Sequence, residues 1–361
     1  MLVHNRSENI ELCILAESQL PSAKKQTDLP RDAAIDFTKG ALVLFMVLYH
    51  WLNYFVGTRG QYYDYLKFLT PSFIFITGFM ISQIQLRRYG NNGRNLSKRL
   101  FVRGLKLLAL FLVLNALVYT ALSRTQVEFS FWGKSLRSFS WAAFVVGTSR
   151  GADGEKSVIF NILVPIAYLL IVSAGLVALT RRVKYAFYCT LCMLVVAVIS
   201  IRFWNLENLY LDLLMVGVLG VVVGFAGSEQ IASVVSHTYI LTILYCLFLA
   251  VITIWGVPLP LQIASVILTT ALLYTAGSRL ARPGASRRTI LLGKYSLLGY
   301  IAQIAILQGL RRISWLSHHG VVASLGCLLL CMLMTLTVVV AVDIARQRSK
   351  IANDLYRLVF A

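Results

Sequence analysis

Residues 36–51 read DFTKGALVLFMVLYHW, from Asp36 through Lys39 to His50 and Trp51. No charged side chain interrupts the apolar run between Lys39 and His50. A helix needs about 20 mostly apolar residues to cross the ~30 Å hydrocarbon core of a bilayer. The pattern therefore predicts a transmembrane helix over residues 37–57.

The composition extends this prediction to the whole chain. Of 361 residues, 58% are hydrophobic and only 14% are charged, and the mean hydropathy is +0.73. Soluble domains have about 25% charged residues, so a water-soluble globule is excluded. The sequence predicts an all-α, polytopic integral membrane protein with about ten transmembrane helices. They are expected near 37–57, 66–86, 100–122, 158–179, 185–204, 209–227, 236–256, 259–278, 290–310 and 319–344.

The charges are few and strongly unbalanced, with 34 Lys and Arg against 15 Asp and Glu, a net charge of +19. In an apolar chain this excess indicates cytoplasmic loops and contact with anionic membrane lipids, and no nucleic-acid partner is expected. Placing the N-terminus inside puts 24 of the 34 basic residues on the inner side. We therefore expect a multi-pass protein of the inner (plasma) membrane. Its parts are a cytoplasmic tail (1–35), a membrane domain (36–345) and a second cytoplasmic tail (346–361).

Polar side chains inside membrane helices are costly, so each is a candidate site residue. Lys39 and His50 are eleven residues apart, which places them on one helix face about 16 Å apart along the axis. Asp36 shares that face. Histidine takes and gives protons near neutral pH, although the same pattern suits a structural hydrogen bond between helices at His50 and a snorkelling anchor at Lys39, with its charge at the membrane surface.

The helix expected at 100–122 opens with Arg99, Arg103 and Lys106, spaced i, i+4 and i+7 and hence on one face. Such a stripe of cations is suited to an anionic group such as a phosphate. Ordinary anchoring at the cytoplasmic surface explains it equally well.

Further residues of interest lie on the second and ninth predicted helices. Gly78 and Ser82 are four residues apart, a spacing that suits close helix packing. No set of Cys and His has metal-ligand spacing, so no metal is expected. The remaining candidates that line a site are Ser72 and Thr77 on the second helix and Ser296, Tyr300 and Gln303 on one face of the ninth.

These motifs together resemble those of a known family. Asp36-x-x-Lys39-Gly with His50 eleven residues after the cation resembles the first helix of the acyltransferase-3 family, which has R-x10-H. The run FIFITGFMIS (73–82) resembles its second helix and that of the heparan-α-glucosaminide N-acetyltransferase group, and the basic cluster at Arg99 resembles its arginine motif. The run 293–303 is similar to G-R-x-S-L-x-x-Y-x-x-H, which occurs in both groups. The sequence departs from the family pattern at three points. Lys39 stands where the family has Arg, the two arginines of the third helix are spaced R-x-x-x-R instead of R-x-x-R, and Gln303 stands where the late motif has His.

The resemblance implies a membrane acyltransferase. It would move an acyl group, with acetyl expected, from cytoplasmic acyl-CoA to a hydroxyl or amine of an extracytoplasmic glycan or glycolipid. It implies His50 as general base or acyl carrier and Lys39 as the group that stabilises charge at the thioester. Arg99, Arg103 and Lys106 would hold the CoA phosphates.

Two other functions use the same polar residues. One is a transporter or flippase for a polar or lipid-linked solute, although no repeated halves or paired broken helices are visible in the sequence. The other is a non-catalytic scaffold with the same fold, which the departures at Lys39 and Gln303 favour.

Overall fold

The computed structural model describes residues 32–56, 62–89, 93–122, 142–147, 159–180, 182–280, 286–311 and 321–360. All regular secondary structure in these ranges is helical, as the sequence predicted. Residues Ala33–Ala361 form one compact unit. Most of the predicted N-terminal tail, residues 1–31, lies outside the described ranges.

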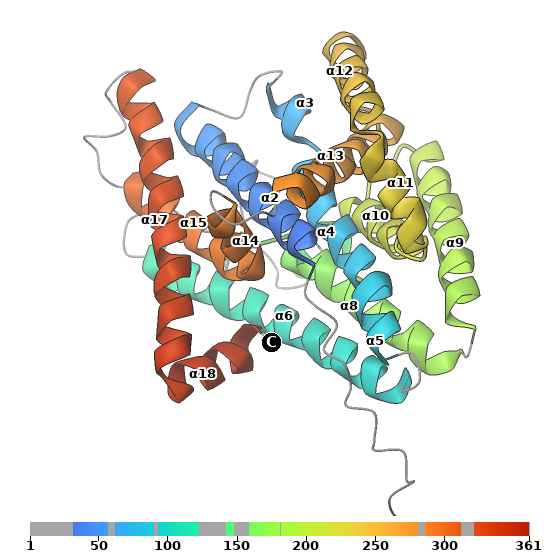
Figure 1. Cartoon of the computed structure of the whole chain (residues 1–361), viewed down its shortest axis with the longest axis horizontal. Helices are drawn as coiled ribbons and strands as arrows, with labels where there is room; N and C mark the ends of the chain where they lie inside the picture. The colour runs from blue at the N-terminus through green and yellow to red at the C-terminus, as the bar shows by residue number, and fades with distance from the viewer. Residues whose placement is uncertain are drawn as a thin grey trace, which may run out of the picture. The chain divides into compact units, whose positions relative to one another are not determined.

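The described helices follow one another along the whole chain (Figure 1). The first group comprises α2 (Ala33–Trp51), η1 (Leu52–Val56), α3 (Tyr62–Leu66), α4 (Leu69–Met80), η2 (Ile81–Leu86), α5 (Arg87–Tyr89), α6 (Gly93–Leu122), η4 (Ala142–Val146) and α8 (Leu163–Leu179). The second group comprises α9 (Val183–Phe203), α10 (Leu209–Val223), α11 (Ser228–Ser236), α12 (Thr238–Trp255), α13 (Leu259–Leu280), α14 (Arg287–Lys294), α15 (Ser296–Arg311), α17 (Val321–Arg348) and α18 (Lys350–Phe360).

Within the described ranges, seven continuous helices are long and apolar enough to cross a membrane. Two of the other predicted spans correspond to shorter apolar helices, α8 and α10. The predicted span 290–310 is not straight, because α14 and α15 meet at 92° around Tyr295. The total of ten spans and the cytoplasmic N-terminus stay predictions.

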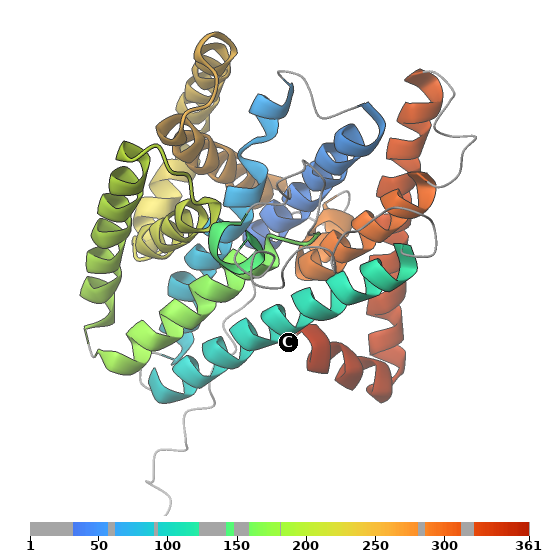
Figure 2. The same cartoon turned by 180° about the vertical axis from the view of Figure 1, so that it is seen from behind.

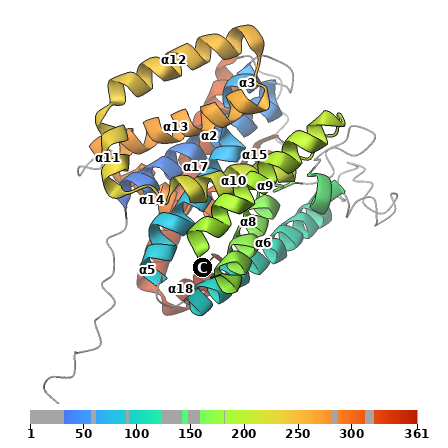
Figure 3. The ribbon, with the colours of Figure 1, turned by 90° about the vertical axis from the view of Figure 1, so that its right-hand side faces the viewer.

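Burial separates the central helices from the peripheral ones. The candidate spans differ in the buried share of their most apolar 18-residue stretch. This share is 56% in α2 with η1 and 61% in the segment that contains α4, but only 11% in α9 and in α12. Large apolar side chains on these outer helices, such as Phe203 and Tyr239, are 80% and 78% exposed. Figure 3 shows α12 and α9 at the periphery of the bundle. This arrangement suits helices that have lipid on their outer faces.

Glycines bring the backbones of central helices into direct contact. A Cβ atom added at Gly78 of α4 would overlap the carbonyl oxygen of Gly217 in α10, and one at Gly220 would overlap the Phe75 carbonyl. Ser82 likewise packs against Gly224. The interpretation of Gly78 and Ser82 as packing residues is therefore confirmed.

A second close crossing joins α2 to α14. A Cβ atom at Gly40 would overlap the Thr289 carbonyl oxygen, and one at Gly293 would overlap the Asp36 carbonyl oxygen. Lys39 and Lys294 are the direct neighbours of these two glycines. The crossing therefore fixes the positions from which both lysines leave their helices.

The segment 346–361, expected to be a tail, is mostly helical. The last turn of α17 reaches Arg348, and α18 fills Lys350–Phe360 after the single intervening residue Ser349. Apolar residues recur in α18 at helical spacing, for example Ile351, Leu355 and Leu358, which is the pattern of an amphipathic helix.

Candidate functional site

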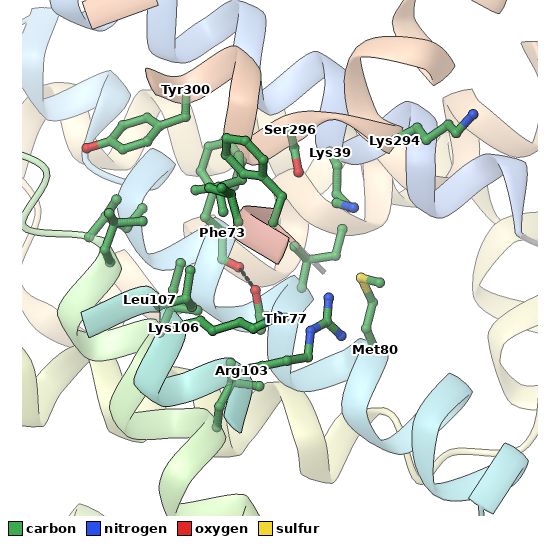
Figure 4. Close-up of a pocket in the computed structure, with 18 of the residues that line it drawn as sticks. Lys39, Phe73, Thr77, Met80, Arg103, Lys106, Leu107, Lys294, Ser296 and Tyr300 are labelled. Carbon is green, nitrogen blue, oxygen red and sulfur yellow. Dashed lines mark hydrogen bonds between the residues drawn. The ribbon is translucent and has the colours of Figure 1, made fainter. Parts of the chain in front are cut away.

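A cavity of about 210 Å³ lies where α2, α4, α6, α8, the α14–α15 bend and α18 meet (Figure 4). Helices far apart in the sequence contribute to it, and close packing of α2 with α14 and of α6 with α8 holds its walls. The cavity brings together six of the candidate residues from the sequence: Lys39, Thr77, Arg103, Lys106, Ser296 and Tyr300.

The charged side chains that line this cavity are all cationic, namely Lys39, Arg103, Lys106 and Lys294. The Lys39 ammonium lies 3.8 Å from the Asp36 carboxylate, and Lys294 lies 3.2 Å from Asp343. Among the described residues, Arg103 has no carboxylate within ion-pair distance.

Figure 4 shows the ends of Lys39 and Arg103 directed toward each other across the cavity, with Lys294 turned away. Lys39 is largely buried, since only 14% of its side chain is exposed, whereas Arg103 is exposed at the mouth. Converging cations from α2 and α6 are an arrangement that suits an anionic group.

Arg99 lies outside the cavity, although it shares a helix face with Arg103. Its guanidinium stacks over the Tyr89 ring at 4.9 Å and hydrogen-bonds the Tyr89 hydroxyl group. Tyr89 ends α5, which lies just before α6 in the chain. The stripe expected from the sequence is therefore divided, with Arg103 and Lys106 at the cavity and Arg99 on the α5 side.

His50 does not line the cavity and is separated from it by one aromatic ring. Its imidazole lies 6.3 Å from the ring centroid of Tyr300, which itself lines the cavity and is 8% exposed. Tyr49 and Tyr54 surround the same imidazole, with centroid distances of 5.4 and 6.5 Å. An aromatic cluster thus holds a proton-active side chain directly behind the cavity wall.

Gln303 lies one turn beyond Tyr300 and is completely buried. Neither atom of its side-chain amide has a hydrogen-bond partner among the described residues, and the same holds for the buried Ser72 hydroxyl. An unsatisfied buried polar group costs about 1–3 kcal/mol, so such groups are typical of places where water or a ligand binds. Thr77, in contrast, donates to the Phe73 carbonyl at 2.7 Å.

The sequence interpretation missed two parts of the cavity wall. Lys294 stands in the motif 293–303 but was not singled out, and Tyr356, Val359 and Phe360 come from α18. Amphipathic spacing in 350–360 is the signal that indicates the second part.

A polar network joins these two parts. The Tyr295 hydroxyl donates to Asp343 at 2.5 Å and accepts from Arg346 at 2.9 Å, and Lys294 donates to the same carboxylate. The guanidinium of Arg346 also lies 4.0 Å from the centre of the Tyr356 ring. The bend at Tyr295, the end of α17 and α18 are thus tied to one another beside the cavity.

Lys39, Arg103 and Lys106 bring three positive charges to the cavity, and the Tyr300 ring lies between the cavity and His50. Comparison of the chain with models of protein families, with curated proteins and with solved structures finds no match.

Proposed function

We propose that the chain is a membrane acyltransferase of the cell's inner (plasma) membrane. It takes an acyl group, with acetyl expected, from cytoplasmic acyl-CoA and transfers it to a hydroxyl or amine of an extracytoplasmic glycan or glycolipid. The observation that carries this proposal is the cavity with Lys39, Arg103 and Lys106, bordered by a tyrosine that contacts His50.

The size and charge of the cavity favour a donor that enters only in part. Drug-sized ligands occupy pockets of about 300–1,000 Å³, so a cavity near 210 Å³ is suited to the thioester end of acyl-CoA. The phosphates would then lie at the mouth, beside the exposed Arg103 and the partly exposed Lys106. Charge-assisted hydrogen bonds to phosphate are among the stronger polar contacts.

The chemistry assigned to the residues is simple acyl transfer. His50 removes the proton from the acceptor hydroxyl or amine, the freed lone pair attacks the thioester carbonyl carbon, and the C–S bond breaks. The thiolate leaves with the proton that His50 returns. Lys39, buried in the cavity wall, stabilises the negative charge that develops on the carbonyl oxygen. In the covalent variant the His50 imidazole first attacks the thioester carbonyl carbon, the C–S bond breaks and CoA leaves as the thiol with the imidazole proton; the acceptor then attacks the acyl-imidazole, takes the acyl group and returns its proton to His50.

One observation favours a second candidate, a transporter of an anionic or lipid-linked solute. The 92° break between α14 and α15 lies at the cavity, where Lys294 and Ser296 flank the bend. Transporters place their sites at such broken helices, usually in two related halves. Within the described residues only one bent pair is present, so acyl transfer is the first proposal.

The donor site predicts different effects for two arginines on the same helix. Arg103→Ala is expected to weaken acetyl-CoA binding to the purified protein by about 10- to 100-fold, because a charge-assisted hydrogen bond contributes about 1.5–3 kcal/mol. Arg99→Ala is the matched control: it removes the same charge four residues away, where the side chain contacts Tyr89. Calorimetry or equilibrium dialysis in detergent measures both variants.

Equal weakening in the two variants would contradict the assignment of the cavity as the donor site. Saturable binding with release of free CoA on adding a glycan acceptor supports the enzyme. Binding without turnover in the wild-type protein, together with solute uptake into proteoliposomes, would favour the transporter. Absence of both binding and uptake would favour a non-catalytic scaffold.

A further inference from the structure

The C-terminal helix α18 has a second surface that the cavity does not use. It runs from the end of α17 toward α6, and Figures 1 and 2 show its end beside α6 from opposite sides. The Lys106 ammonium donates to the Arg357 carbonyl oxygen at 3.4 Å. The helix is therefore docked onto the bundle.

The inward face of α18 is apolar and fixed in place. Val359 and Phe360 line the cavity together with Tyr356, whose ring packs at 5.3 Å against that of Tyr295. The side chain of Arg346 bonds Asn353 from the end of α17 at 2.9 Å. These contacts fix the rotation of α18 about its own axis and so decide what its other faces meet.

A second apolar face points away from the protein. Ile351, Leu355 and Leu358 are 81%, 60% and 68% exposed. Their spacing of i, i+4 and i+7 makes them one stripe along the helix. Three large aliphatic side chains on a helix of 11 residues would be strongly unfavourable in water, since each loses about 1.5–3 kcal/mol by staying exposed.

The third face is polar and exposed, with Lys350, Asp354 and Arg357. At about 100° per residue, the aliphatic stripe lies between this polar face and the face packed on the protein. A helix with protein on one side, charges on another and an exposed aliphatic stripe between them has the arrangement of a helix that lies in a membrane surface.

The charges near the stripe favour an anionic surface. From 346 to 357 the chain has four basic residues, Arg346, Arg348, Lys350 and Arg357, against one acidic residue, Asp354. Of the basic ones, Arg348, Lys350 and Arg357 are exposed. Basic residues beside an interfacial helix are attracted to anionic headgroups.

We propose that α18 lies in the lipid–water boundary of an anionic membrane leaflet. Ile351, Leu355 and Leu358 enter the upper acyl chains, and Lys350 and Arg357 reach the anionic headgroups. Because the opposite face of the helix lines the cavity, the mouth of the cavity lies at the level of the headgroups. This inference is independent of acyl transfer and holds equally for a transporter.

The test measures the depth of single residues in the full-length protein. The six native cysteines are replaced by alanine, and single cysteines at Ile351, Leu355, Leu358 and Asp354 carry a nitroxide label in lipid nanodiscs. Oxygen, which concentrates in lipid, and a water-soluble nickel chelate serve as collision partners. We expect the three stripe positions to collide several-fold more with oxygen than with the chelate, and Asp354 to show the reverse.

Two results would overturn the proposal. Equal access of the chelate to all four positions would place α18 in water. Shielding of the stripe from both reagents would mean that a second copy of the chain or another protein covers it. Melting temperatures of the labelled proteins, compared with the cysteine-free parent, identify any variant that fails to fold.

Lipid composition tests the electrostatic part separately. Adding phosphatidylglycerol to phosphatidylcholine nanodiscs is expected to lower the access of the chelate to a label at Leu355 several-fold. Lys350→Gln with Arg357→Gln should remove this dependence, while Lys184→Gln with Arg279→Gln, which changes equal charge on other helices, should keep it. No dependence on anionic lipid in the parent protein would contradict this part of the proposal.

Discussion

Replacing His50 with alanine is expected to lower acyl transfer by at least about 100-fold, the usual contribution of a general acid–base group. His50 is the histidine of α2 and lies directly behind the cavity, with its ring 6.3 Å from that of Tyr300. In the proposed mechanism, loss of the imidazole removes the group that takes the proton from the acceptor hydroxyl or amine. Release of CoA from acetyl-CoA in the presence of a cell-envelope glycan acceptor measures the effect.

Binding separates this chemical role from a structural one. His50 does not line the cavity, so His50→Ala is expected to bind acetyl-CoA within about threefold of the parent, a difference below 1 kcal/mol. His237→Ala is the matched control, because that histidine is exposed at the junction of α11 and α12. Full turnover in His50→Ala would contradict the assigned role, and joint loss of turnover, binding and thermal stability would indicate a structural residue.

Much of the helical architecture was predictable from hydrophobicity, because a lipid-spanning segment needs a long apolar run whatever its neighbours are. The break at Tyr295 was not. Residues 290–310 are mostly apolar, and the cause of the bend is tertiary: Gly293 packs on α2, while the Tyr295 hydroxyl is held by Asp343 and Arg346. The two hydroxyl contacts join residues about fifty positions apart, and the contact of Gly293 with Asp36 joins residues much farther apart. Hydrophobic periodicity within one segment carries no information on such contacts.

The candidate site was predictable in part for a similar reason. Helical spacing correctly placed Arg103 and Lys106 together, and both line the cavity. The same spacing grouped Arg99 with them, but the direction of a long side chain depends on its neighbours, and Tyr89 provides a stacking partner on the other side. Lys294 and Tyr356 reach the cavity through the α2–α14 crossing and the docking of α18, neither of which follows from local pattern.

The second large effect is expected at Gly293, where α14 and α2 touch. A methyl group there would overlap the carbonyl oxygen of Asp36 and also approach the Gly40 backbone nitrogen. Both atoms belong to the backbone of a helix, so no side-chain rotation relieves the overlap and the helices must separate. We expect Gly293→Ala to lower the free energy of unfolding by about 3 kcal/mol, the upper end of the usual cost of overpacking.

Separation of these helices should also reach the site, because Lys39 and Lys294 flank the two glycines of the crossing. Gly293→Ala is therefore expected to lose acetyl-CoA binding, measured by calorimetry or equilibrium dialysis. It is also expected to melt at a lower temperature, measured by tryptophan fluorescence during heating in detergent. Gly309→Ala, on α15, is the matched control: an added Cβ meets no described atom within 4 Å, and alanine is the better helix former by about 1 kcal/mol. If both variants melt and bind alike, the crossing tolerates a side chain and does not determine where the lysines lie. If Gly293→Ala alone is affected, the contact between two helix backbones is what holds the cations of α2 and α14 at one cavity.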